Sequence, residues 1–169
     1  MTQIRSILVA TDFSDTAKIA VLKAIELVQA FHASLEVLHV IDDPYEFAGQ
    51  VPRYLPEADA FLQTLKDAAN RDLNRVLTPE EVTHYRATLN MSVGKPAAEI
   101  VRFAKDRDVD MVVVGTHGRG AVWHMLLGSV AEQIVRNAHC PVLTVRNVPS
   151  KGVLPGTTVS VPSIDIGLI

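Results

Sequence analysis

Residues 111–120 of the chain read MVVVGTHGRG, and residues 128–132 read GSVAE. The run of β-branched residues in the first stretch predicts a buried strand that ends at Gly115. The glycine-spaced segment after it predicts a loop, and the second stretch has the capping-box pattern of a helix that begins at Ser129. A strand, a glycine loop and a helix N-terminus in this order are typical of phosphate binding. The surrounding sequence decides whether a nucleotide site is built here.

Strands are expected on both sides of this unit. The apolar runs at residues 4–10, 35–41 and 141–146 predict core strands, the first of them buried on both faces, whereas the polar run at 83–91 predicts an edge strand. Together with residues 111–114 these runs give five strands.

Helices are expected between the strands. Apolar residues recur at helical spacing in 17–31 and 58–77, and a further helix begins at Pro96. The Thr-Pro-Glu-Glu run at 78–81 is expected to break the second of these helices. Its apolar residues are expected to face the core: Phe61, Leu62, Leu65, Ala69, Leu73 and Val76.

Alternating strands and helices predict an α/β fold with a doubly wound, Rossmann-like parallel sheet. We expect five strands in the order 3-2-1-4-5 with helices on both faces. Ligands of such sheets bind beyond the carboxyl ends of the strands, where the strand order reverses. Ala10, Thr11 and Asp12 at the end of the first strand therefore become neighbours of Val114 and Gly115 at the end of the fourth.

The length of 169 residues indicates one domain, which we place at residues 1–147. Residues 148–169 contain few charges and several prolines and glycines, and they predict a tail that is either disordered or laid against a partner subunit. Residues 42–57 predict a long loop of the kind that covers a site.

The glycine loop fits neither common nucleotide motif. It begins like a Walker A loop, but Ala121 and Val122 stand where that motif requires lysine and serine or threonine. Its spacing is not Gly-x-Gly-x-x-Gly either. The spacing that the loop does have is Gly115-x₂-Gly118-x₉-Gly128-Ser129.

This spacing resembles that of the universal stress protein family, whose ATP-binding members carry Gly-x₂-Gly-x₉-Gly-Ser/Thr at this place. Other segments that resemble the family are the run at 11–14, the strand end at 38–40 and the run at 140–143. The resemblance covers residues 4–146, and the tail and the 42–57 loop lie outside it.

The resemblance implies a site for ATP, ADP or AMP, with magnesium carried by the phosphates. Asp12, beside Ala10 and Thr11, would contact the adenine or ribose, and main-chain groups of Val40 would contact adenine. Close backbone approach to the ribose and phosphates is implied at Val114, Gly115 and Gly118. The phosphates would be held by a further set: Gly128, Ser129 and Val130, with His117 and Arg119 as additional contacts.

Composition limits the classes of binding partner and the cellular compartment that we expect for this protein. A net charge of −3 without a basic stripe argues against nucleic acid, and no stretch approaches the roughly 18 apolar residues of a membrane span. The single cysteine, Cys140, excludes an internal disulfide and favours the reducing cytoplasm. His117 and His124 have no companion ligand at metal-binding spacing, so a metal held by protein side chains is not expected.

The sequence therefore favours a nucleotide-binding stress-response sensor or adaptor with an unidentified protein partner. The resemblance also implies a homodimer joined through the last core strand, and an uncharged sheet edge at 142–145 favours such a cover independently. No catalytic base or Walker lysine is evident, which favours binding over turnover. A slow ATPase or related nucleotide-processing enzyme and a ligand-free dimeric interaction module remain the alternatives.

Overall fold

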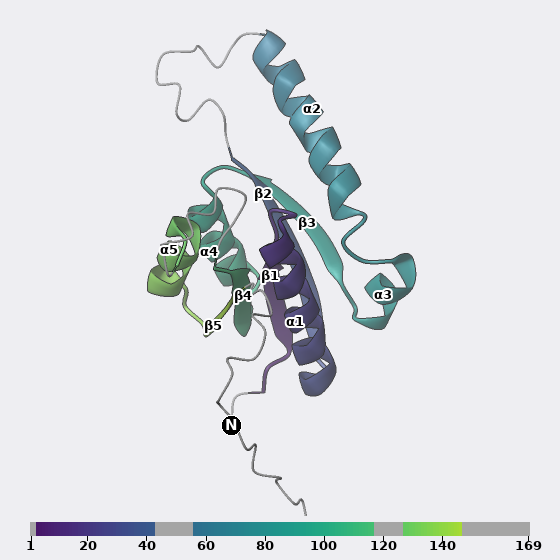
Figure 1. Ribbon diagram of the computed structural model, residues 1–169, viewed down its shortest axis with the longest axis vertical. Coiled ribbons are helices and arrows are strands. Elements are labelled where there is room, and N and C mark those ends of the chain that lie inside the picture. The colour runs from purple at the N-terminus through teal and green to yellow at the C-terminus, as the bar shows by residue number, and fades with distance from the viewer. Residues whose placement is uncertain (1–2, 43–55, 117–126, 147–169) are drawn as a thin grey trace, which may run out of the picture.

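The computed structural model describes residues 3–42, 56–116 and 127–146. Within them a five-stranded, all-parallel sheet has the order β3-β2-β1-β4-β5, which confirms the predicted fold class (Figure 1). The strands are β1 (Ser6–Ala10), β2 (Ser34–Ile41), β3 (Thr88–Val93), β4 (Met111–Gly115) and β5 (Val142–Val145). The helices are α1 (Asp15–Phe31), α2 (Pro56–Leu73), α3 (Pro79–His84), α4 (Pro96–Asp106) and α5 (Ser129–Asn137).

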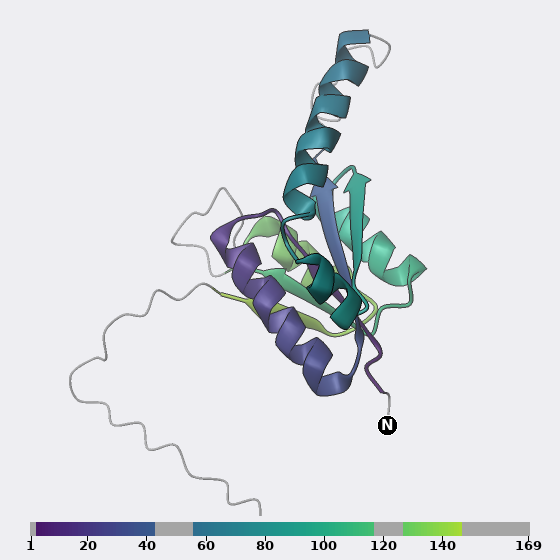
Figure 2. The same cartoon turned by 90° about the vertical axis from the view of Figure 1, so that its right-hand side faces the viewer.

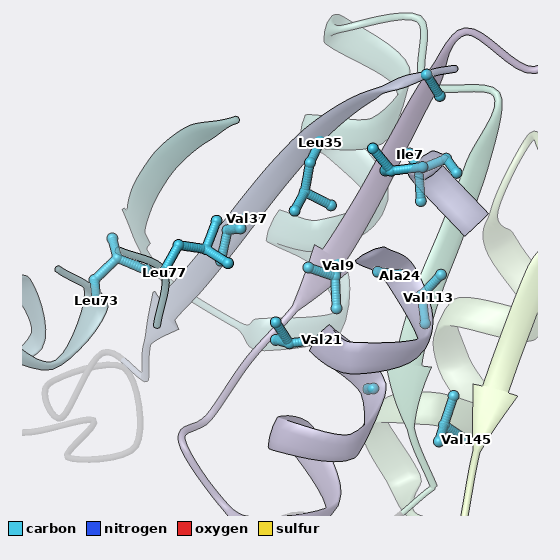
Figure 3. Close-up of a cluster of buried hydrophobic side chains, with 13 residues drawn as sticks. Ile7, Val9, Val21, Ala24, Leu35, Val37, Leu73, Leu77, Val113 and Val145 are labelled. Carbon is cyan, nitrogen blue, oxygen red and sulfur yellow. The ribbon is translucent and has the colours of Figure 1, made fainter. Parts of the chain in front are cut away.

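Strand β1 lies at the centre of the sheet and is buried on both faces. Its side chains alternate, so that Ile7 and Val9 point to one face while Leu8 and Ala10 point to the other. Helix α1, the end of α2 and α3 cover the first face, and α4 and α5 cover the second (Figures 1 and 2). Figure 3 shows the first of these two cores, in which Val21 and Ala24 of α1 pack on Val9 and Val113.

The segment between α2 and β3 differs from the prediction. The Thr-Pro-Glu-Glu run does follow the end of α2, but it also begins a new helix, α3. Thr78 accepts a hydrogen bond from the Glu81 N–H at 3.2 Å, and the Glu81 carboxylate accepts one from the Thr78 N–H at 2.8 Å. This capping box makes the predicted strand wrong over 83–87, and β3 begins at Thr88.

Helix α2 is shorter than predicted, and its first half lies apart from the core. The helix ends at Leu73, where i→i+3 hydrogen bonds from Arg75 and Val76 tighten the chain. Ala69 and Leu73 are buried as expected, but Phe61 is 50% exposed. The physical reason is position, because the first half of α2 extends past the carboxyl ends of the strands, where no sheet lies beneath it (Figure 2).

Candidate functional site

A cleft of about 830 Å³ opens at the carboxyl edge of the sheet, where the strand order turns from β1 to β4. The ends of β1, β2 and β4 form its floor, and α2, α4 and the first turn of α5 form its walls. All predicted site residues within the described part of the chain line it: Ala10, Thr11, Asp12, Val40, Val114, Gly115, Gly128, Ser129 and Val130. His117, Gly118 and Arg119 lie outside the described residues. Their roles, and the nucleotide contacts of the lining residues, stay predictions.

The N-terminus of α5 borders the cleft without a side-chain cap. Gly128 is the cap residue, with φ −70° and ψ 152°, and Ser129 is the first helical residue. The predicted capping box is therefore wrong, because the Glu132 carboxylate instead pairs with Arg136 one turn later at 2.9 Å. The amides of this first turn remain available to an anion, which the positive end of the helix dipole also attracts.

Hydrogen bonds of Thr116 connect the end of β4 to β5 and to the start of α5. The Thr116 N–H continues the ladder of the sheet by donating to the Val145 carbonyl at 2.8 Å. The Thr116 carbonyl in turn accepts a hydrogen bond from the Gly128 N–H at 2.6 Å. Thr116 is only 4% exposed, so this junction is fixed in the interior beside the cleft.

Gly115 has a packing role that the sequence did not reveal. A Cβ atom at this position would lie 3.0 Å from the Cγ2 atom of Thr16 on α1. The glycine thus permits the close approach of α1 to the end of β4, in addition to the close approach of a ligand that the sequence predicts.

The turn after β1 holds Asp12 in place through Ser14. One carboxylate oxygen of Asp12 accepts hydrogen bonds from the Ser14 N–H at 3.1 Å and the Ser14 hydroxyl at 2.6 Å. The Ser14 Oγ atom accepts from the Ala17 N–H at 3.2 Å and so caps α1. The N-terminus of α1 therefore has a side-chain cap where that of α5 has none, and Asp12 supports this cap instead of forming it.

Sequence reasoning missed one wall of the cleft and two of its carboxylates, those of Asp42 and Asp72. Leu65 and Ala69 face inward as predicted, but they line the cleft together with Ala68 and Asp72 of the same helix. Asp42, at the end of β2, also lines it. Helical periodicity identifies the inner face of α2, but it carries no information about whether that face meets a core or a cavity.

The charges of the cleft are unevenly distributed. Asp12, Asp42 and Asp72 contribute carboxylates from the ends of β1 and β2 and from α2, whereas α5 contributes main-chain N–H groups. A phosphate would be repelled by the carboxylates and attracted by the helix terminus. The same carboxylates can accept hydrogen bonds from sugar hydroxyls or base amino groups.

Residues 3–42, 56–116 and 127–146 contain no group of three or more His, Cys, Asp or Glu side chains that could hold a metal ion. None of the helices in the described part of the chain is long and apolar enough to cross a membrane.

The sheet order, the helices on both faces and the cleft at the strand reversal define a doubly wound α/β domain, with its cleft at the sheet edge where such folds bind their ligands. A family model described as the universal stress protein family matches residues 3–146, and the chain belongs to this family.

Relatives of this family resemble the chain over most of their length. Universal stress protein MJ0531 of Methanocaldococcus jannaschii is 34% identical over 145 residues, covering 84% of this chain and 82% of the relative. The structure of MJ0577, from the same organism, superposes with a TM-score of 0.71 at 29% identity and covers 88% of this chain and 100% of that one. The structure of UspA from Lactobacillus plantarum gives a TM-score of 0.70 at 28% identity, with coverages of 86% and 100%.

Two more distant structures share the fold and contain nucleotides. A universal stress protein in complex with cAMP is 24% identical with a TM-score of 0.59. The universal stress protein from Archaeoglobus fulgidus in complex with dAMP is 21% identical with a TM-score of 0.55. At these identities the likeness to this chain extends to the fold alone.

Proposed function

We propose that the chain binds an adenine nucleotide in the cleft and acts as a nucleotide-dependent sensor or adaptor. One observation carries the proposal: the uncapped N-terminus of α5 borders a cleft at the strand reversal that is also lined by carboxylates from the ends of β1 and β2 and from α2. In this arrangement the phosphates lie against Gly128, Ser129 and Val130, and Asp12 and the main chain of Val40 contact the nucleoside. Proteins of the same fold that hold cAMP and dAMP show that the fold accommodates this class of ligand.

We expect magnesium to reach the site bound to the phosphates of the nucleotide. Mg²⁺ needs few protein ligands when phosphate oxygens and water complete its octahedral shell. Ser129, beside the phosphates, carries an oxygen ligand of the kind that it prefers, and the described residues offer no dedicated metal cluster. Magnesium would therefore increase the affinity for ATP more than the affinity for AMP.

Calorimetry with ATP, AMP, GTP and adenosine tests the proposal, in the presence and absence of magnesium. We expect saturable binding of adenine nucleotides and weaker binding of GTP and adenosine. Absence of binding to all four, together with no nucleotide in the mass spectrum of gently purified protein, would favour the ligand-free interaction module. Phosphate release above the uncatalysed rate in pure protein would favour the slow ATPase.

We also propose that a second copy of the chain pairs with β5. This strand lies at one edge of the described sheet, and Leu143 on it is 38% exposed. An apolar edge strand of this kind usually requires a cover. Sedimentation of wild type and of Leu143→Lys tests this assignment: the wild type should be a dimer and the variant a monomer. A wild-type monomer would contradict it.

A further inference from the structure

Both main-chain polar groups of Thr11, its N–H and its carbonyl, form hydrogen bonds with residues of β2. The β1–β2 ladder ends with the pair Ala10 and Leu38, and the Thr11 N–H extends it by donating to the Leu38 carbonyl at 2.9 Å. The Thr11 carbonyl accepts a hydrogen bond from Nδ1 of His39 at 2.8 Å. Because a carbonyl can only accept, Nδ1 of this imidazole carries the proton. Thr11 is 6% exposed, so loss of this donor would leave a buried carbonyl without that partner.

The same imidazole also supports Phe13, two residues further along the turn. Phe13 adopts a left-handed conformation with φ 65°, which is uncommon for a residue other than glycine. Its N–H donates to the Thr11 Oγ1 atom at 3.1 Å, and its ring lies 4.3 Å from the His39 ring, centroid to centroid. A left-handed aromatic residue persists only where neighbouring contacts hold it, and His39 provides one of them.

Asp12 lies between these two supported residues and lines the cleft, as His39 also does. We propose that His39 is a positioning residue of the nucleotide site. Its Nδ1–H and its ring fix the turn from Thr11 to Phe13 and thereby place the Asp12 carboxylate against the ligand. This inference rests on the proposed function, and it adds a residue of β2 that acts on the ligand through the turn after β1.

The chain offers a matched control at the other end of β1. There the Asp110 carboxylate accepts hydrogen bonds from the N–H groups of Arg5 and Ser6 at 2.8 and 3.0 Å. Like His39, Asp110 uses a side chain to hold the main chain of β1, but it does so at the amino end of the strand, away from the cleft. Asp110→Ala therefore removes side-chain hydrogen bonds to the main chain at the amino end of β1 and leaves the residues of the cleft unchanged.

Two substitutions at position 39 separate the hydrogen bond from the ring. His39→Phe keeps an aromatic ring and removes the donor, with His39→Leu as the replacement if the phenylalanine variant does not fold. His39→Asn places an amide nitrogen close to the position of Nδ1. The affinity for AMP should fall about tenfold in His39→Phe, the value of one hydrogen bond, and largely recover in His39→Asn.

Non-additivity then distinguishes positioning from general loosening. If His39 acts through Asp12, His39→Phe should have little further effect on AMP affinity in an Asp12→Ala background. Asp110→Ala should bind AMP like the wild type. Unchanged affinity in His39→Phe, or a full additional loss in the Asp12→Ala background, would overturn the proposal.

Hydrogen exchange of the ligand-free protein gives a readout that needs no nucleotide. The Phe13 and Ser14 amides should lose protection in His39→Phe and regain it in His39→Asn. Unchanged protection in His39→Phe overturns the role of His39 in the turn. If wild-type protein binds no adenine nucleotide but the turn responds as expected, the proposed function fails while the structural role of His39 stands.

Discussion

Ser129→Pro should strengthen the fold and weaken the binding of phosphate. Proline is well tolerated at the first position of a helix, and α2, α3 and α4 already begin at Pro56, Pro79 and Pro96. Gly128, the residue before it, has φ −70° and ψ 152°, which is the extended conformation that a residue before proline prefers. The substitution should therefore raise the free energy of unfolding by about 0.5–1 kcal/mol by restricting the unfolded chain.

The expected loss of affinity follows from the donors that this substitution removes. Ser129 offers its N–H and its hydroxyl to a phosphate, and a hydrogen bond to a charged group contributes about 1.5–3 kcal/mol. Because Ser129 is exposed, we take the lower value for each donor, which gives about 3 kcal/mol or about 100-fold in Kd. Ser129→Ala removes the hydroxyl alone and should cost about tenfold.

Calorimetry with AMP and adenosine, combined with denaturant unfolding, checks both effects. Adenosine has no phosphate, so its affinity should be the same in wild type, Ser129→Ala and Ser129→Pro. An intact, stabilised Ser129→Pro variant that binds AMP as well as the wild type would refute the placement of phosphate at α5. A variant with lower stability would instead refute the assigned conformation of this helix start.

Three further predictions concern stability and reactivity. Gly115→Ala should lower the free energy of unfolding by about 1–3 kcal/mol through overpacking against Thr16, and Thr16→Ser should recover most of that loss in denaturant titrations. The Arg102 guanidinium holds the pKa of Glu99 in the folded protein below its ordinary value. The Glu99 carboxylate therefore stabilises the fold at pH values above the pKa that it has in the unfolded chain. This stabilisation is lost as the pH falls through the lowered pKa of the folded state. Glu99→Gln should therefore cost about 1 kcal/mol at pH 7 and nothing once Glu99 is protonated in both states, which unfolding curves across this pH range would show or contradict. Burial raises the pKa of the Cys140 thiol, so iodoacetamide should modify it more slowly than free cysteine at pH 8 and at the same rate once the protein is unfolded; equal rates in the native state would contradict this.

The fold follows from the sequence because its strongest signals are periodic and local. Runs such as 7–10 and 111–114 are buried on both faces, and alternation with helices leaves few chain paths through the sheet. The prediction failed at 83–87, where a capping box at Thr78 and Glu81 begins a helix of only six residues. A helix this short has little periodicity, so its cap is the main signal that it leaves in the sequence.

The site was predictable only where glycine spacing and strand ends marked it. Ala10, Val114 and Gly128 meet at the cleft because topology places the carboxyl ends of β1 and β4 side by side. Asp72 could not be predicted, because its place on the cleft depends on how α2 leans over the sheet edge. The contact of His39 with Thr11 joins residues 28 positions apart and depends on strand register, which no local pattern contains.

The hydrogen bond between Thr116 and Gly128 has a consequence for how this domain can change. It joins the residues on either side of positions 117–127, so the connection between the end of β4 and the start of α5 is fixed by described residues alone. The entropic cost of lengthening such a closed loop grows only slowly, by roughly 0.6 kcal/mol for each doubling. We therefore expect insertions between Thr116 and Gly128 to change the free energy of unfolding little as long as this hydrogen bond is kept.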